Sequence, residues 1–191
     1  MNPTRKLILI KHSKPAVEPD VPSHQWHLSE EGRRRCDSLA GKLAIHAPDL
    51  VIASDEPKAA ETGRIVADLL HKPFCTAPGL HEHDRGNVRH MPSSQFISFV
   101  ALFFQKGNEL VLGRETAVQA HARFSTALNN VLNANPAGNL AVVTHGTVLS
   151  LFVASHSSLR AFDLWRRLGL PSFVVFALPE RQLLETVERI P

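Results

Sequence analysis

The sequence predicts an α/β protein, a three-layer α/β/α sandwich with a mostly parallel central sheet. Two short, continuous apolar segments, residues 6–11 and 140–144, are typical of parallel strands that are buried on both faces. Other strand-like segments alternate with segments whose apolar residues recur every three or four positions, a spacing that indicates helices. Such alternation predicts one sheet with helices on both of its faces.

Local signals predict where the elements begin and end. Glu30 and Glu31 indicate a helix start, because carboxylates are stabilised in the first turn. Pro57 indicates another, with Ser54 or Asp55 as the expected cap. In chain order we expect strand 6–11, helix 29–47, strand 49–54, a helix from 57 to about 72, a weaker strand 73–77, helix 116–132, strand 140–144, an apolar helix 147–154, helix 160–168, and strands near 173–178 and 182–190.

The stretch 85–113 is expected to be irregular, and its character is left open. It contains four of the ten phenylalanines, in a run too short to span a bilayer. If the run is helical, Phe96, Phe99 and Phe103 share one face. It is then either an insert packed on the core, or a lid or dimer contact that would favour a substrate with an apolar portion.

Composition limits the classes of function. A chain of 191 residues suits a single domain, 1–191, with a possible lid or insert at about 85–113. The net charge of +3 is spread along the chain, which disfavours nucleic acid as a partner. The sequence has no apolar run of about 18 residues, so we expect no membrane partner. Cys36 and Cys75 form no CxxC pair, which fits a reducing compartment. We therefore expect a cytoplasmic protein.

Polar residues follow four of the predicted strands, and their pattern resembles a known family. Because carboxyl ends of parallel strands meet at one edge, Lys11-His12, Ser54 to Lys58, Glu82 and His145 are expected to converge. The chain resembles the histidine phosphatase superfamily, in its phosphoglycerate-mutase-like branch. The matching segments are Lys11-His12-Ser13 for Arg-His-Gly, Leu28-Ser-Glu-Glu-Gly-Arg33 for Leu-Thr-x-x-Gly-Arg, Ser54 to Thr62 for Ser-Pro-Leu-x-Arg-Ala-x-x-Thr, Glu82, Gly113 to Thr116 with Arg123, and Thr144-His145-Gly146.

The resemblance implies a metal-independent phosphatase with no cofactor, acting on a small phosphorylated substrate or a phosphoprotein. His12 would be the nucleophile and carry a phosphohistidine, while His145 would donate to a phosphoryl oxygen. Glu82, with a raised pKa, would act as general acid and then as base. Phosphate would be bound by Lys11, Lys58, Ser13 and Gly146, the last at a helix N-terminus.

Three departures from the family pattern bear on activity. Lys11 and Lys58 stand where the family has arginine, so the positive charge is kept but the bidentate hydrogen bonding to phosphate is lost. Ser13 replaces a glycine, and segment 14–19 lacks the polar loop of the mutases, which disfavours a mutase. Two interpretations remain open: a phosphatase with an unusual substrate, or a catalytically weak phosphate-binding or regulatory module. A homodimer is possible in either case.

A metal site is a further alternative. His81, His83, Asp84 and His90 are imidazole and carboxylate groups of the kind that bind zinc. They lack an accompanying HExxH pattern. The phosphatase interpretation also assigns a catalytic role to Glu82, which lies in the same turn. We therefore expect no metal.

Overall fold

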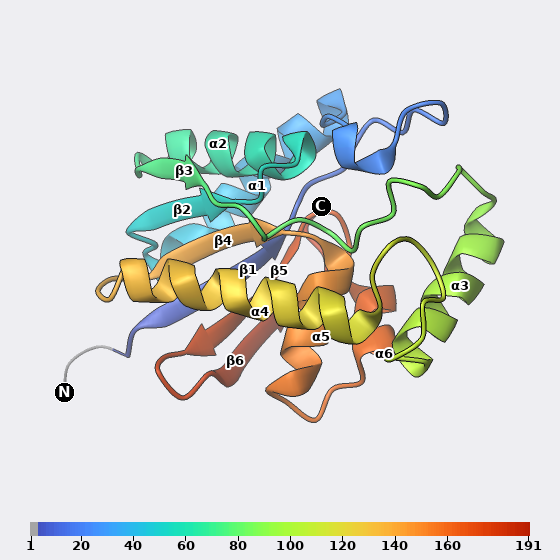
Figure 1. Cartoon of the computed structure of the whole chain (residues 1–191). Helices are drawn as coiled ribbons and strands as arrows, with labels where there is room; N and C mark the ends of the chain where they lie inside the picture. Colours follow the sequence, from blue (N-terminus) through green and yellow to red (C-terminus); the bar gives the residue numbers. More distant parts are fainter. Residues whose placement is uncertain (1–3) are drawn as a thin grey trace.

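A computed structural model describes residues 4–191 and contains one six-stranded sheet (Figure 1). The strand order is β3-β2-β4-β1-β5-β6. Pairing is parallel between β1 and β4, β4 and β2, and β2 and β3, whereas β5 and β6 are antiparallel to their neighbours. The strands are β1 (Lys6–Lys11), β2 (Leu50–Ala53), β3 (Phe74–Thr76), β4 (Leu140–Thr144), β5 (Ser172–Ala177) and β6 (Gln182–Val187).

Helices cover both faces of the sheet, and the alternation of side chains along β1 shows how. Leu7 and Leu9 pack with the cluster beneath α4 and α5, while Ile8 and Ile10 pack with the opposite cluster beneath α1 and α2. The predicted α/β/α sandwich with a mostly parallel sheet is confirmed (Figure 1). The helices are α1 (Glu30–Leu43), α2 (Pro57–Leu70), α3 (Ser93–Gln105), α4 (Ala117–Ala134), α5 (Gly146–Ser155) and α6 (Ala161–Arg167), with short 3-10 turns at Ser23–Gln25 and Ala44–His46.

Most helix starts follow the predicted signals, with one difference. Ser29 caps α1 by accepting from the Gly32 N–H, and Thr116 forms a capping box with Gln119 at the start of α4. The start of α2 was predicted to be capped by Ser54 or Asp55, but the capping residue is Glu56, with no side-chain cap bond. The Glu56 side chain is instead held inside the molecule, as described below.

The stretch 85–113 is not wholly irregular, because it contains the thirteen-residue helix α3. Val100 and Phe103 are buried, and Phe103 stacks on the His83 ring with centroids 4.1 Å apart. Phe96 and Phe104 face Trp165 and Phe162 of α6. The helical alternative is therefore correct, and its packing fits an insert over the core; a role as lid or dimer contact stays a prediction.

No helix within residues 4–191 is both long and apolar enough to cross a membrane.

The loop after β1 lies close against α1, and Gly32 makes that approach possible. A Cβ atom at Gly32 would lie 2.0 Å from the Lys14 carbonyl oxygen. Gly41, in the same helix, has open space, with nothing within 4 Å of the equivalent position.

We expect Gly32→Ala to lower the free energy of unfolding by about 3 kcal/mol, because the added methyl group must displace backbone. Gly41→Ala is the matched control and is expected to raise it by about 0.5–1 kcal/mol. Urea unfolding measures both. Equal effects of the two substitutions would contradict the close packing of the loop on α1.

Candidate active site

The predicted residues converge at the carboxyl edge of the parallel strands. The ladder continues one step beyond the strand ends, where the His12 N–H donates to Thr144 O at 3.0 Å and the Ser54 N–H donates to Val143 O at 2.9 Å. These two backbone bonds hold His12 beside His145, with their ring centroids 5.1 Å apart. Both rings are buried, His145 completely and His12 at 7% exposed. The two histidines therefore face each other as the sequence predicted.

The environment of His12 keeps its ring neutral and fixes the position of its hydrogen. Nδ1 lies 2.7 Å from the Ser13 carbonyl oxygen, which can only accept, so Nδ1 carries the hydrogen. Nε2 then holds the lone pair. Burial lowers the pKa of His12 well below its ordinary value, and neighbouring His145 and Lys58 lower it further. At neutral pH the ring is thus in the form that a nucleophile requires.

His145 is also neutral and is held by the segment after β2. Its Nε2 lies 3.0 Å from Ser54 Oγ and 3.7 Å from Oε1 of Glu56. Burial lowers the pKa of His145 well below its ordinary value, and the charge of Lys58 adds to the effect. Its Nδ1 is buried and has no hydrogen-bond partner among the described residues.

Glu82 differs from the expectation of a raised pKa. Its Oε2 accepts from the Thr147 N–H at 3.1 Å and its Oε1 from the Val148 N–H at 3.3 Å, so the carboxylate rests on the N-terminus of α5. Burial favours the neutral acid, but the charge of Arg85 and the backbone N–H donors outweigh it and hold the pKa of Glu82 well below its usual range. Glu82 is therefore a carboxylate at neutral pH.

The two lysines are occupied by groups of the protein itself. Lys58 Nζ donates to Ser23 O at 2.7 Å and to the Glu56 carboxylate. Lys11 Nζ donates to Leu168 O at 2.7 Å, and burial lowers the pKa of Lys11 to about 8, with Glu82 opposing that effect. A lysine with a pKa near 8 is only partly deprotonated at neutral pH, so its charge is largely retained.

Ser13 and Gly146 have structural partners that explain their identities. The Ser13 hydroxyl donates to Gly32 O at 2.7 Å and its N–H donates to Thr62 Oγ1 at 3.0 Å. The hydroxyl hydrogen of Ser13 is thus bonded within the protein, and the binding of phosphate by Ser13 stays a prediction. A Cβ atom at Gly146 would lie 3.0 Å from Lys11 Cε, so the glycine leaves room for the Lys11 side chain.

Sequence reasoning missed two charged residues of the site. Glu56 contacts Lys58 and His145, and Arg85 Nη2 lies 3.6 Å from Glu82 Oε2. Arg85 also lies over the Phe96 ring, with its guanidinium carbon 5.1 Å from the ring centroid. The signal for Glu56 was a carboxylate where the family pattern has an apolar residue; Arg85 lay in the stretch expected to be irregular.

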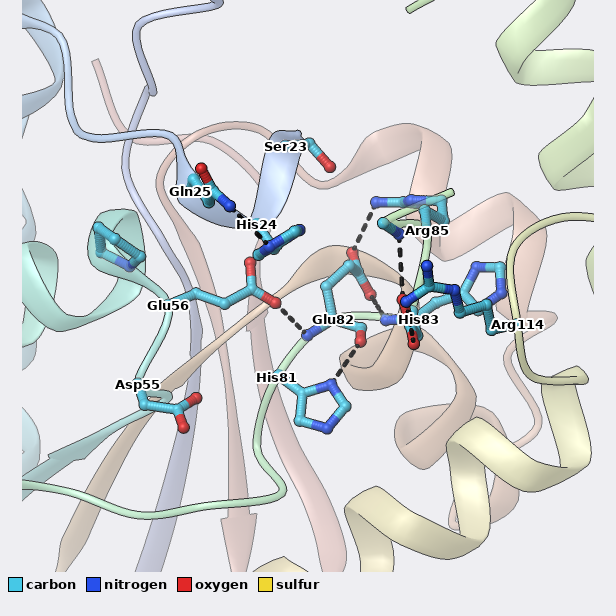
Figure 2. A pocket seen from close by; sticks show the side chains of 13 residues that line it. Ser23, His24, Gln25, Asp55, Glu56, His81, Glu82, His83, Arg85 and Arg114 are labelled. Atoms are coloured by element: carbon cyan, nitrogen blue, oxygen red, sulfur yellow. Dashed lines mark hydrogen bonds and ion pairs between the residues drawn. The ribbon is translucent and has the colours of Figure 1, made fainter. Parts of the chain in front are cut away.

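Two cavities adjoin these charged residues. One, of about 510 Å³, is lined by Glu56, Glu82 and Arg85 among others (Figure 2). A larger one, of about 960 Å³, lies between the loop before α1 and the segment leading into α3. Ser23, Arg85 and Gly86 line both cavities, so the two are adjacent. Neither His12 nor His145 lines them, and the carboxylates of Glu56 and Glu82 face the smaller cavity instead (Figure 2).

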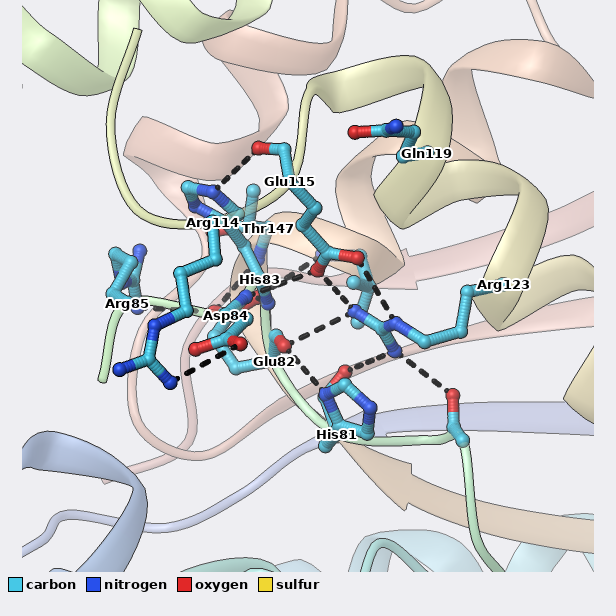
Figure 3. Close-up of polar contacts among 12 residues, drawn as sticks. His81, Glu82, His83, Asp84, Arg85, Arg114, Glu115, Gln119, Arg123 and Thr147 are labelled. Atoms are coloured by element: carbon cyan, nitrogen blue, oxygen red, sulfur yellow. Dashed lines mark hydrogen bonds and ion pairs between the residues drawn. The ribbon is translucent and has the colours of Figure 1, made fainter. Parts of the chain in front are cut away.

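An arginine of α4 braces the loop that carries Glu82. Arg123 donates to the carbonyl oxygens of Gly79, His81 and Glu82 at 2.9, 2.9 and 3.1 Å (Figure 3). It also pairs with Glu115, Nη2 to Oε1 at 2.5 Å, and the same carboxylate accepts from the Asp84 N–H at 3.0 Å. One guanidinium and one carboxylate thus fix the backbone on both sides of Glu82.

The residues considered as a metal site are bound elsewhere. His81 Nδ1 donates to Glu82 O at 2.9 Å, and His83 Nε2 lies 3.1 Å from Glu115 O (Figure 3). Within residues 4–191, no three His, Cys, Asp or Glu side chains are grouped so as to hold a metal ion. The candidate cluster is therefore not assembled.

The fold and the pair of facing histidines define the class of protein to which this chain is related. The family model of the histidine phosphatase superfamily, branch 1, matches residues 7–181. The chain belongs to this superfamily, as its strand-end motifs suggested.

Solved structures agree in fold at low sequence identity. A "Mycobacterial hydrolase 1" has a TM-score of 0.77 at 17% identity, over 98% of this chain and all (100%) of that one. A mycobacterial glucosyl-3-phosphoglycerate phosphatase with inorganic phosphate has a TM-score of 0.75 at 18% identity, over 97% and 98% of the chains. A phosphoserine phosphatase mutant from Entamoeba histolytica has a TM-score of 0.76 at 14% identity, over 96% of each chain. No curated protein sequence matches.

We expect Arg123→Met to lower the free energy of unfolding by about 2–3 kcal/mol, because it leaves Glu115 and three carbonyl groups without their partner. Arg114→Met is the matched control. Arg114 is largely exposed and lies 4.0 Å from Asp84, so its loss should cost less than about 0.5 kcal/mol. Urea unfolding measures both, and similar losses would contradict the bracing role of Arg123.

The depressed pKa values of His12 and His145 make stability depend on pH. Between neutrality and mild acid the unfolded chain binds protons that the folded protein excludes, so stability is full above the unfolded pKa near 6.5 and declines as pH falls below it. We expect the melting temperature to fall from pH 7.5 to 5.5. In His12→Asn/His145→Asn the fall should be smaller by about 2–4 °C.

Thermal unfolding across this pH range tests the expectation. Substitution of the exposed His24 by Asn serves as the control and should leave the pH slope unchanged. An unchanged slope in the double variant would show that the two buried rings titrate alike in the folded and unfolded states.

Proposed function

We propose that this protein is a phosphatase that hydrolyses a phosphomonoester or a phosphoprotein through a phosphohistidine at His12, without a metal. The observation that carries the proposal is the neutral His12 ring, with its hydrogen held on Nδ1 by Ser13 O at 2.7 Å and its Nε2 lone pair free for attack. His145, 5.1 Å away between ring centroids, supplies a second imidazole for the phosphoryl oxygens. Membership of the superfamily supports the same activity.

The reaction proceeds in two displacements. His12 Nε2 attacks phosphorus, an N–P bond forms, and the O–P bond to the leaving group breaks. The charge of the bound substrate raises the pKa of Glu82, which takes up a proton from water as the substrate binds and gives it to the leaving alkoxide. Glu82 is then a carboxylate again and takes the proton of the water that attacks phosphorus and releases phosphate and His12.

The cavities suit a substrate larger than phosphate alone. The two adjacent cavities, about 510 and 960 Å³, are large enough for a leaving group of considerable size. Val21, Trp26 and Phe96 give the larger space apolar lining, while Arg85 and Arg89 add positive charge. Glucosyl-3-phosphoglycerate and phosphoserine, named for two similar structures, are both phosphomonoesters, which supports that substrate class.

A second candidate is the catalytically weak phosphate-binding or regulatory module. It is favoured by the bonds that Lys11 and Lys58 make to Leu168 O, Ser23 O and Glu56, since these leave fewer donors for phosphate. The two candidates differ in turnover and not in fold.

We expect His12→Ala to lower hydrolysis of p-nitrophenyl phosphate at least about 10³-fold, because no nucleophile remains to form the N–P bond. His27→Ala is the control. His27 is largely exposed and pairs with Glu61, so its loss should leave the rate within about twofold. The assay contains a chelator and is repeated with a panel of phosphorylated metabolites and a phosphopeptide.

The double variant Lys11→Arg/Lys58→Arg separates the two candidates. Wild-type turnover that depends on His12 establishes the phosphatase. No wild-type turnover, with activity appearing only in the double variant, would instead establish the binding module. Light scattering of the same samples tests for a homodimer, and a cytoplasmic setting is proposed because Cys36 and Cys75 are both free thiols.

A further inference from the structure

The Glu56 carboxylate lies among the groups that a phosphate ion would need. One of its oxygens accepts from Lys58 Nζ. The other accepts from the Glu82 N–H at 2.9 Å (Figure 2). The same oxygen lies 3.7 Å from His145 Nε2. Glu56 is only 8% exposed, so these contacts are made away from bulk water. A cation, a backbone donor and an imidazole thus surround an anion that belongs to the chain itself.

The start of α2 fixes Glu56 in this position. Its carbonyl oxygen accepts from the Ala59 and Ala60 N–H groups at 2.9 and 3.0 Å, and Pro57 follows at the first helical position. Its N–H donates to Ser54 Oγ at 3.3 Å, the same hydroxyl that contacts His145. The backbone is therefore anchored on both sides, and only the side chain is free to move.

A phosphate ion cannot bind these donors while Glu56 holds them. Two anions a few ångströms apart in a partly dehydrated site repel each other strongly. The ion pair also occupies Lys58, which donates a second hydrogen bond to Ser23 O, so at most one of its three N–H groups remains for a ligand. Binding of phosphate therefore requires the carboxylate to turn away, and the cavity of about 510 Å³ beside it provides the space.

We infer that Glu56 sets the affinity of the site for phosphate: its carboxylate competes with inorganic phosphate for Lys58 and His145, so the free ion binds weakly and a phosphate ester binds only with further contacts from its leaving group. The inference rests on the proposed function for the place of the phosphoryl group. An ester gains contacts with its leaving group in the two cavities, and those contacts offset the displacement of Glu56. Free phosphate gains none, so it binds weakly and leaves readily after hydrolysis.

Calorimetric titration with inorganic phosphate at pH 7 tests this inference without relying on turnover. Glu56→Gln keeps the shape of the side chain and removes its charge, so we expect phosphate to bind about tenfold or more tightly than to wild type. Glu61→Gln is the matched control, because it removes one negative charge from the same helix. Glu61 pairs with His27 and Arg33 and not with Lys58 or His145, so its loss should change the affinity less than about twofold.

A second variant covers the case in which Glu56→Gln does not fold. Glu56→Leu also removes the carboxylate and places an apolar side chain of similar length beside Lys58, and it should bind phosphate more tightly than wild type as well. Thermal unfolding establishes which variants are folded. Unchanged or weaker phosphate binding in the folded variants, including binding too weak to detect in all of them, would overturn the inference.

The outcome is independent of the fate of the proposed activity. Tighter phosphate binding in the variants without hydrolysis in any form supports the competition by Glu56 and rejects the phosphatase. Hydrolysis that depends on His12, with phosphate affinity unchanged in Glu56→Gln, supports the phosphatase and rejects the competition.

Discussion

The pairing of β1 with β4 is the constraint on which the site depends. Parallel register places Lys11 opposite Thr144, and the bond from the His12 N–H to Thr144 O carries the ladder one residue further. His12 and His145 therefore leave the sheet side by side, whatever the loops beyond them do. Side chains of adjacent parallel strands have few alternatives at this separation, which explains how two buried imidazoles come to lie 5.1 Å apart without a direct bond between them.

The site is organised by its own carboxylates as much as by its histidines. Glu82 rests on the first amides of α5, where the family resemblance implied that phosphate would benefit from the helix terminus. Glu56 rests on Lys58, where phosphate was expected to find a cation. Lys58 thus has an internal anion as partner, which avoids the large cost of an unpaired buried charge, while Lys11 is bonded to the Leu168 carbonyl oxygen. Any ligand anion must compete with that internal arrangement.

The sequence predicted most strands and helices along the chain and the meeting of distant residues, since these follow from apolar periodicity and from the rule that parallel strands end at one edge. It did not predict the partners of Ser13, Lys11 or Glu82. Those depend on which nearby carbonyl or amide a polar side chain meets after folding, as when Ser13 Oγ donates to Gly32 O. Periodicity carries no information on such choices. Arg85 was missed because an isolated charged residue on a loop resembles any solvated one. Glu56 differs from the apolar residue of the family pattern, but that difference does not reveal which buried groups its carboxylate contacts.

Lys58 and Glu56 suit each other as a buried ion pair. A lysine has three N–H donors, and one carboxylate and one carbonyl oxygen satisfy two of them. An arginine has five donors in a rigid fork, so the same two acceptors would leave most of them unpaired in a buried place. The exchange of arginine for lysine therefore does more than weaken a grip on phosphate. It allows two of the three N–H donors of Lys58 to be satisfied inside the protein, which is the arrangement on which the proposed competition between Glu56 and phosphate rests.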